Sequence, residues 1–180
     1  MNEGLIPSRY ARALYKVDLE RRSAAHTYEL MKSLSAAFAA NGGLRDMVTN
    51  PFVDSADKTR IVATAAGATA DDTTFGDFLT LLVDKRRIDM VQQMALAYLD
   101  IYRKANNIKR VEVVSAAPLA DDVLDRIRRI VAGELAGASM EFTTSVDSSL
   151  IGGFIVNIDN ERLDASMRNR LKELRLSLLN

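Results

Sequence analysis

Few side chains in this 180-residue chain are of the kinds that carry out catalysis. The sequence has no cysteine and a single histidine, His26, which excludes thiolate nucleophiles, disulfides, cysteine-ligated metals and histidine-cluster zinc sites. The acidic pairs Asp71-Asp72 and Asp121-Asp122 each precede an expected helix, where carboxylates stabilise the positive end of the helix dipole. We interpret these pairs as helix caps rather than acid–base catalysts, and we expect no catalytic residue, no metal site and no cofactor.

A glycine pair and several basic runs also have structural interpretations. Gly152-Gly153 is not followed by Lys-Ser or Lys-Thr at P-loop spacing, and it lies between two expected strands, so we interpret it as a loop or bulge. Lys and Arg together number 24, as do Asp and Glu. Because proteins that neutralise phosphates usually carry a basic excess, nucleic-acid binding is not expected. The basic runs at 85–87, 103–104, 109–110 and 126–129 are interpreted as solvated charges, and the alternative is that some of them dock on an acidic partner.

No segment has the pattern of a membrane span or a secretory signal. The longest uninterrupted apolar run, Met94–Leu99, has six residues, against about 20 in a membrane-spanning helix. The N-terminus has no positive region followed by an apolar stretch. We expect a soluble, intracellular chain with no direct membrane insertion, which would reach a membrane only through a partner.

Helical periodicity runs through most of the first hundred residues, where apolar side chains recur every three or four positions. The glycines of Asn41–Gly43 end one expected helix and Asn50-Pro51 ends the next. Ser55 or Asp57 is expected to cap the fourth helix. The expected helices cover residues 10–17, 28–38, 44–48, 55–66, 72–83 and 88–103, which predicts an all-α six-helix bundle.

The pattern changes after residue 105. Alternation and β-branched residues predict strands at 111–115, 140–146 and 154–158, with a helix that opens at Pro118. Asp164 is expected to cap a last helix, whose apolar seam either packs on the sheet or binds a coiled-coil partner. That seam consists of Met167, Leu171, Leu174 and Leu178. The expected fold class is therefore α+β with two domains: an all-α bundle over 1–105, and a small domain over 106–180 in the order strand, helix, strand, strand, helix.

The first and fifth expected helices carry wider apolar surfaces than one buried face requires. Together they would form a groove that admits a partner helix, and the small side chains of Ala11 and Ala13 would let that helix approach closely. The alternative is that all these residues belong to the core, and periodicity alone favours this alternative. The residues concerned are Tyr10, Ala11, Ala13, Leu14, Phe78, Leu81 and Leu82.

Five segments, in order along the whole chain, resemble the delta subunit family of bacterial F-type ATP synthase, equivalent to the mitochondrial oligomycin-sensitivity-conferring protein. They are Ser8–Tyr15, Asn50-Pro51, Val114–Leu119, Val146–Ile158 and Asp164–Leu171. The chain departs from the family where Asp164-Ala165-Ser166 replaces Asp-Gly-Ser, and in having no glycine before the acidic residue near 159. The most specific match is the signature around the paired glycines, made of Val146, Asp147, Leu150, Ile151, Gly152, Gly153 and Val156.

The resemblance implies a stator subunit that ties the catalytic head to the peripheral stalk. The helical domain of the family takes the N-terminal helix of an alpha subunit between its first and fifth helices, and the second domain holds the C-terminal ends of the b subunits. One copy per complex would lie on the cytoplasmic face of the membrane, held there through the complex. This reverses the preference stated above, so the seven groove residues become the candidate partner-binding site. The alternative is a free-standing adaptor that binds an amphipathic helix of another partner.

Overall fold

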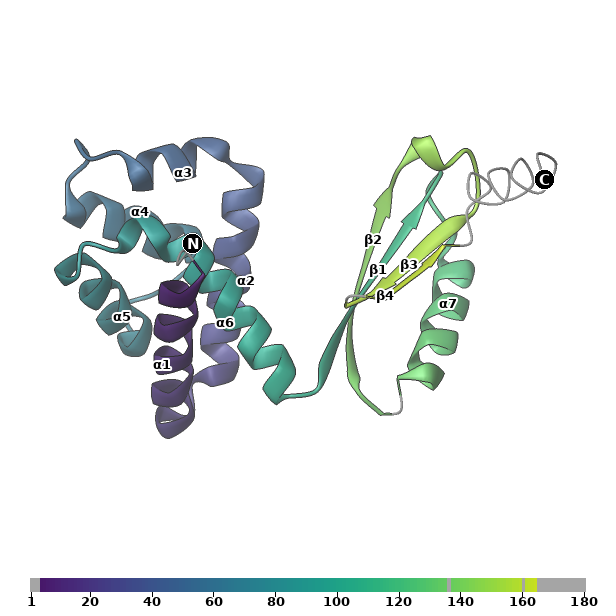
Figure 1. The fold of residues 1–180 in the computed structure, drawn as a ribbon, viewed down its shortest axis with the longest axis horizontal. Helices are drawn as coiled ribbons and strands as arrows, with labels where there is room; N and C mark the ends of the chain where they lie inside the picture. The colour runs from purple at the N-terminus through teal and green to yellow at the C-terminus, as the bar shows by residue number, and fades with distance from the viewer. Residues whose placement is uncertain (1–3, 136, 160, 165–180) are drawn as a thin grey trace. The chain divides into compact units, whose positions relative to one another are not determined.

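The computed structural model describes residues 4–135, 137–159 and 161–164. The chain divides into two compact units, residues 1–104 and 105–180. The first is helical and the second combines helix and sheet (Figure 1), so the α+β class and the division into a helical part and a small mixed part agree with the prediction.

The described part of the first unit consists of helices joined by short turns. Helix α3 begins where the side chain of Asn41 accepts a hydrogen bond from the Gly43 amide, and α4 ends at Gly67, whose φ of 74° closes the helix. The cap of α4 is Asp54, not Ser55 or Asp57, because its carboxylate accepts from the Ser55 amide. The elements are α1 (Leu5–Arg21), α2 (Ala24–Ala40), α3 (Gly42–Thr49), α4 (Ser55–Ala66), α5 (Thr73–Asp84), the 3₁₀ turn η1 (Ile88–Met90) and α6 (Val91–Ala105).

A buried carboxylate joins three of these helices. Asp18 of α1 has no exposed surface and accepts hydrogen bonds from Ser23 Oγ at 2.7 Å, Thr27 Oγ1 at 2.8 Å and Tyr98 Oη at 2.6 Å. These donors lie before α2, on α2 and on α6. A buried polar group is costly unless its hydrogen bonds are made, so this network fixes how α1, α2 and α6 meet within an otherwise apolar core.

The same network predicts a loss of stability at alkaline pH. Burial raises the pKa of Tyr98 well above its ordinary value, and the hydrogen bond to Asp18 and the charge of that carboxylate add to the shift. The protonated phenol therefore stabilises the fold fully below pH 10, where an unfolded tyrosine begins to titrate. This contribution is lost as the pH rises from there towards the folded pKa, by about 1.4 kcal/mol per pH unit. We expect urea unfolding between pH 9 and 11 to show a flatter decline for Tyr98→Phe than for the wild type.

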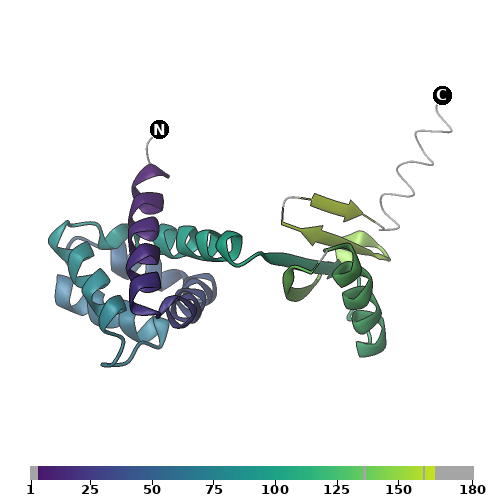
Figure 2. The ribbon, with the colours of Figure 1, turned by 90° about the horizontal axis from the view of Figure 1, so that it is seen from below.

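In the residues that the structure describes, the second unit has a four-stranded sheet with a helix along one face (Figure 2). Its strand order is β2-β1-β3-β4. The β1–α7–β2 crossover makes β1 and β2 parallel, and β3 is antiparallel to both β1 and β4. The core lies between α7 and the sheet, where Ile127 and Val131 pack on Val111, Val113 and Val156. The elements are β1 (Ile108–Ser115), α7 (Asp121–Glu134), β2 (Ser139–Val146), η2 (Ser148–Leu150), β3 (Phe154–Ile158) and β4 (Glu161–Asp164).

Two predictions for this unit were wrong in detail. Helix α7 begins at Asp121 and not at Pro118, because Ala120 just before it is extended and the Asp121-Asp122 pair occupies the favourable first turn. The order also includes a strand that was not predicted, β4, so that Asp164 pairs with Ile155 in the sheet. The expected last helix, with its seam of Met167, Leu171, Leu174 and Leu178, lies outside the described residues.

Candidate partner-binding surface

Helices α1 and α5 lie against each other and run in opposite directions. At one end Arg21 of α1 donates to Asp77 Oδ2 at 2.9 Å and to Thr74 Oγ1 at 3.2 Å. At the other end Arg87, just after α5, donates to the Tyr10 hydroxyl at 2.9 Å. Its guanidinium also lies 5.3 Å from the centre of the Tyr10 ring. Hydrogen bonds at both ends therefore hold the two helices that the sequence singled out.

The structure divides the seven predicted residues between the core and the surface. Ala11, Leu14, Phe78 and Leu82 are at most 5% exposed and belong to the core of the first unit. Tyr10 is partly buried and packs against that core. Ala13 is exposed, and Leu81 has 43% of its surface exposed. Four of the seven residues are thus buried in the hydrophobic core and are not accessible to a partner. Of the other three, Ala13 and Leu81 are the exposed ones that a partner could contact.

One residue that the candidate set omitted belongs with these two. Val17 is 37% exposed and lies four positions after Ala13, on the side of α1 that carries Tyr10. Leu81 lies four positions after Asp77, on the side of α5 that faces Arg21. We call the surface formed by Ala13, Val17 and Leu81, with Tyr10 at one end, the α1/α5 surface.

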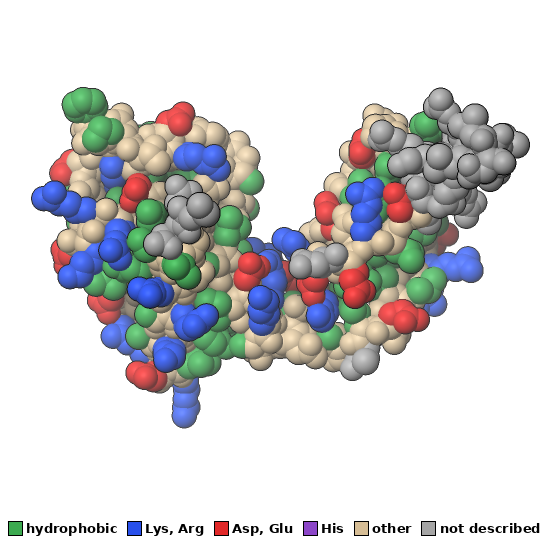
Figure 3. Space-filling view, in the orientation of Figure 1, with side chains coloured by type: hydrophobic (Ala, Val, Ile, Leu, Met, Phe, Trp, Pro, Cys, Tyr) green, Lys and Arg blue, Asp and Glu red, His purple; other side chains and the backbone are tan. Residues whose placement is uncertain are grey.

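Basic side chains border the α1/α5 surface. Arg9 and Lys16 are exposed on α1, and Lys85 and Arg86 are exposed after α5. In the space-filling view, hydrophobic side chains lie among Lys and Arg over these two helices (Figure 3). Asp77 and Asp84 of α5 are exposed as well, so the edges carry charges of both signs, and an amphipathic helix would cover the apolar strip between them.

The lone histidine makes a structural contact. His26 of α2 contacts the carboxylate of Asp72, the residue before α5. The same carboxylate accepts from the Thr69 amide at 2.7 Å and the Thr69 hydroxyl at 3.1 Å. The bond from the Thr69 backbone lowers the pKa of Asp72, and His26 lowers it further. The contact ties α2 to the loop before α5.

The paired-glycine signature forms the connection between β2 and β3. Leu150 and Val156 are buried, whereas Val146 and Ile151 are exposed. The Asp147 amide donates to the Ser115 carbonyl at 2.8 Å and its carboxylate accepts from the Ser149 amide at 2.9 Å. The backbone turns through positive φ at Ile151 (67°) and Gly153 (79°). Gly152-Gly153 lies in a loop between strands, as predicted. The contacts of the signature residues stabilise the connection between β2 and β3 in the second unit.

Within the described residues, no cluster of His, Cys, Asp or Glu could hold a metal ion. Over the same ranges, no helix is long and apolar enough to cross a membrane.

Comparison with known proteins covers nearly the whole chain. The model of the family described as "ATP synthase delta (OSCP) subunit" matches residues 6–178. The protein named ATP synthase subunit delta from Bacteroides thetaiotaomicron is 35% identical over 176 residues, spanning 97% of this chain and 94% of the relative. Its namesake from a Picosynechococcus species is 32% identical over 175 residues, spanning 94% and 91%.

A solved structure has the same fold. One chain of the mitochondrial ATP synthase hexamer of Toxoplasma gondii superposes with a TM-score of 0.75 at 23% identity, over 97% of both chains. The family match and the full-length relatives carry the assignment. The chain belongs to the ATP synthase delta (OSCP) subunit family.

Proposed function

We propose that this chain joins the catalytic head of an F-type ATP synthase to its peripheral stalk by binding a different partner with each of its two units. Its family membership makes it a peripheral-stalk subunit of that complex, and the family is a non-catalytic component. The first unit would bind the N-terminal helix of an alpha subunit at the α1/α5 surface. The second unit would bind the C-terminal ends of the b subunits, and one copy would lie on the cytoplasmic face of the membrane.

Binding of the alpha-subunit helix to the first unit, which we call the first joint, is supported by the exposed apolar strip at the contact of α1 and α5. Ala13, Val17 and Leu81 remain exposed there although the helices beneath them are well packed. The buried residues Leu14 and Phe78 belong to the core of the same unit. A docked helix would therefore bind a surface that the core already holds in place, so that little conformational entropy is lost on binding.

The proposed mechanism is mechanical. Rotation inside the head exerts torque on the alpha and beta subunits, and a stator must hold them still. Removing apolar surface from water contributes about 25 cal/mol per Å², less the cost of association. Because the chain has two compact units, each end of the joint can be specific for its own partner.

Calorimetric titration tests the first joint. The full chain is titrated with a synthetic peptide of about the first twenty alpha-subunit residues from the same organism, and we expect one-to-one binding. Leu81→Glu should weaken binding about tenfold, because its carboxylate would be covered without a partner. Thr80→Glu is the matched control, since Thr80 is exposed and donates only to the carbonyl of Gly76 within its own helix. A folded chain that does not bind the peptide would refute the proposal for this surface.

A further inference from the structure

Three basic side chains lie in a row on the solvent side of α1. Arg9, Arg12 and Lys16 are exposed, and spacings of three and four positions place them on one side of the helix. Among the residues that the structure describes, none of the three forms an ion pair, a side-chain hydrogen bond or a ring contact. We call these three residues the α1 stripe. Their positive charge is not neutralised by the described part of the chain.

Basic side chains on other helices do have an acidic partner. In each of α2, α4, α6 and α7, a basic residue lies three positions after an acidic one and forms an ion pair with it. The pairs are Glu29–Lys32 at 3.8 Å, Asp57–Arg60 at 2.8 Å, Asp100–Arg103 at 3.7 Å and Asp125–Arg128 at 3.0 Å. The positions three and four before each residue of the α1 stripe hold no acid, so α1 lacks this internal neutralisation.

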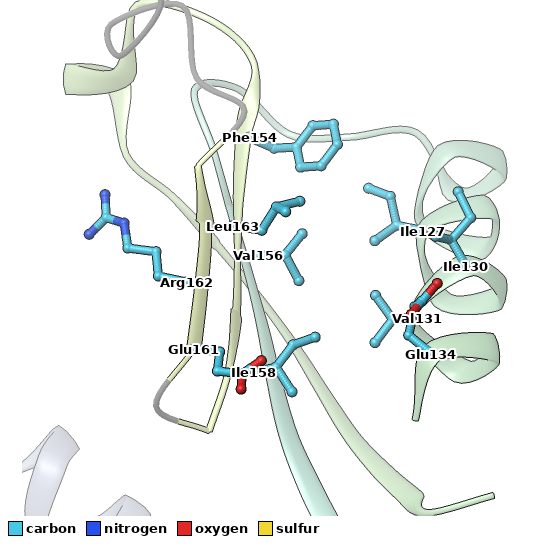
Figure 4. Close-up of a pocket in the computed structure, with 10 residues that line it drawn as sticks. All are labelled: Ile127, Ile130, Val131, Glu134, Phe154, Val156, Ile158, Glu161, Arg162 and Leu163. Carbon is cyan, nitrogen blue, oxygen red and sulfur yellow. The ribbon is translucent and has the colours of Figure 1, made fainter. Parts of the chain in front are cut away.

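A basic residue beside an apolar surface of the second unit is also neutralised. An apolar pocket of about 600 Å³ lies between α7 and strands β3 and β4, and Arg162 of β4 lies at its border. The Arg162 side chain points away from the apolar residues of the pocket (Figure 4) and donates to Asp164 Oδ2 at 3.2 Å. The α1 stripe borders an apolar surface too, but it has no such partner.

The α1 stripe opposes the stability of its own helix. Arg9 and Arg12 are three positions apart, and Arg12 and Lys16 are four apart, spacings at which like charges destabilise a helix. Glu20 is the one exposed acidic residue of α1. It follows Lys16 by four positions, the less favourable order for an acid and a base, and the two form no ion pair. The fold does not use these charges, so we expect an anionic partner to use them.

The position of the α1 stripe indicates which partner this is. Ala13 of the α1/α5 surface lies four positions after Arg9 and three before Lys16, so the stripe runs beside that surface. The exposed acids at the same surface, Asp77 and Asp84, lie on α5, which makes the α1 border the positive one. A helix docked on the α1/α5 surface would bring the protein that carries it next to the stripe.

We propose that the α1 stripe makes a second contact with the catalytic head, to an acidic protein surface next to the docked alpha-subunit helix. This inference rests on the proposed function, since it takes the head as the partner. Burial on the α1/α5 surface supplies most of the affinity, and charge pairing at the stripe speeds encounter and fixes the orientation of the chain. A contact beside the docked helix also resists rotation about the axis of that helix, which a stator requires.

Comparing the whole head with the alpha-subunit peptide separates the two contacts. The triple variant Arg9→Gln/Arg12→Gln/Lys16→Gln removes the charge of the stripe, and glutamine keeps the helix propensity. We expect its affinity for the head, purified without this chain from the same organism, to fall about tenfold at low salt. Its affinity for the peptide should stay within about twofold of the wild type, because exposed charges beside an apolar site contribute little. Its thermal midpoint should be the same or higher, because the like charges are gone.

Salt and a matched variant provide the controls. Raising the salt from about 0.05 M to about 0.3 M should weaken head binding by the wild type towards that of the variant, because exposed charges are screened. Lys32→Gln/Arg60→Gln/Arg128→Gln removes the same charge from three other helices and should leave head binding within about twofold.

Three results would overturn the inference while leaving the proposed function in place. They are unchanged head binding in the stripe variant, an equal loss in the two triple variants, and a loss for the peptide as large as the loss for the head. A folded wild-type chain that binds neither the head nor the peptide would refute the proposed function, and this inference with it.

Discussion

Ala13→Glu is expected to weaken binding of the alpha-subunit peptide about 30-fold. Ala13 is exposed on α1, so the substitution leaves the core intact. A docked helix would cover the new carboxylate, and the glutamate side chain, which is longer than that of alanine, would also keep the helix from approaching closely. Arg9 and Lys16 are solvated neighbours, and ion pairs of that kind recover only a small part of the loss. A net cost of about 2 kcal/mol for a charge covered without a proper partner corresponds to about 30-fold in affinity.

Leu19→Glu provides the matched control on the same helix. Leu19 is 55% exposed and lies six positions from Ala13, about 120° away around α1. We expect its affinity for the peptide to stay within about twofold of the wild type. Calorimetry gives both affinities, and thermal unfolding checks that both variants fold. If Ala13→Glu binds as tightly as Leu19→Glu does, Ala13 does not belong to the site.

The sequence predicted the two helices of this surface better than the residues on it. Periodicity marks which positions of a helix are apolar, but the apolar arcs of α1 and α5 are each shared between the core and the surface. Ala11 and Leu82 lie at the middle of the buried arc and are fully covered, whereas Ala13 and Leu81 lie at its edge. Which edge of the apolar arc stays exposed depends on the position of the neighbouring helix. Tertiary packing sets that position, so the periodicity of one helix does not predict it.

Strand β4 was missed for a related reason. Its sequence, Glu161 to Asp164, holds three charged residues and one leucine, so it has no apolar alternation to recognise. Pairing with β3 makes it a strand. The chain turns there at Asp159, which has a φ of 48°. Its carboxylate accepts from the Arg110 amide and from Lys109 Nζ, both at 3.0 Å. The pairing partners of β4 are close in sequence, from Ile158 with Glu161 to Ile155 with Asp164, and contacts with residues about fifty positions away hold the turn at Asp159 in place.

Asp18 is the third feature that periodicity could not find, since a charged residue on a helix is ordinarily read as exposed. Asp18→Ala is expected to lower the free energy of unfolding of the first unit by about 3 kcal/mol. The change leaves Ser23 and Thr27 without their acceptor and leaves Tyr98 only its long bond to the Ala24 carbonyl, at 3.4 Å, and an unpaired buried hydroxyl costs about 1 kcal/mol or more. Urea unfolding followed by circular dichroism measures the loss.

Asp100→Ala is the control for this measurement, because the Asp100 side chain is 67% exposed and its ion pair with Arg103 spans 3.7 Å. The Arg103 side chain is 16% exposed, but an ion pair of this length with a solvated carboxylate contributes little, so we expect a change below about 0.5 kcal/mol. The double variant Asp18→Ala/Tyr98→Phe separates the network from the cavity that Asp18→Ala leaves. With both partners gone, no phenol is left unpaired, and the double variant should be more stable than the sum of the two single losses predicts. Strict additivity would mean that Tyr98 and Asp18 contribute independently, and that the contact between α1 and α6 depends on apolar packing alone.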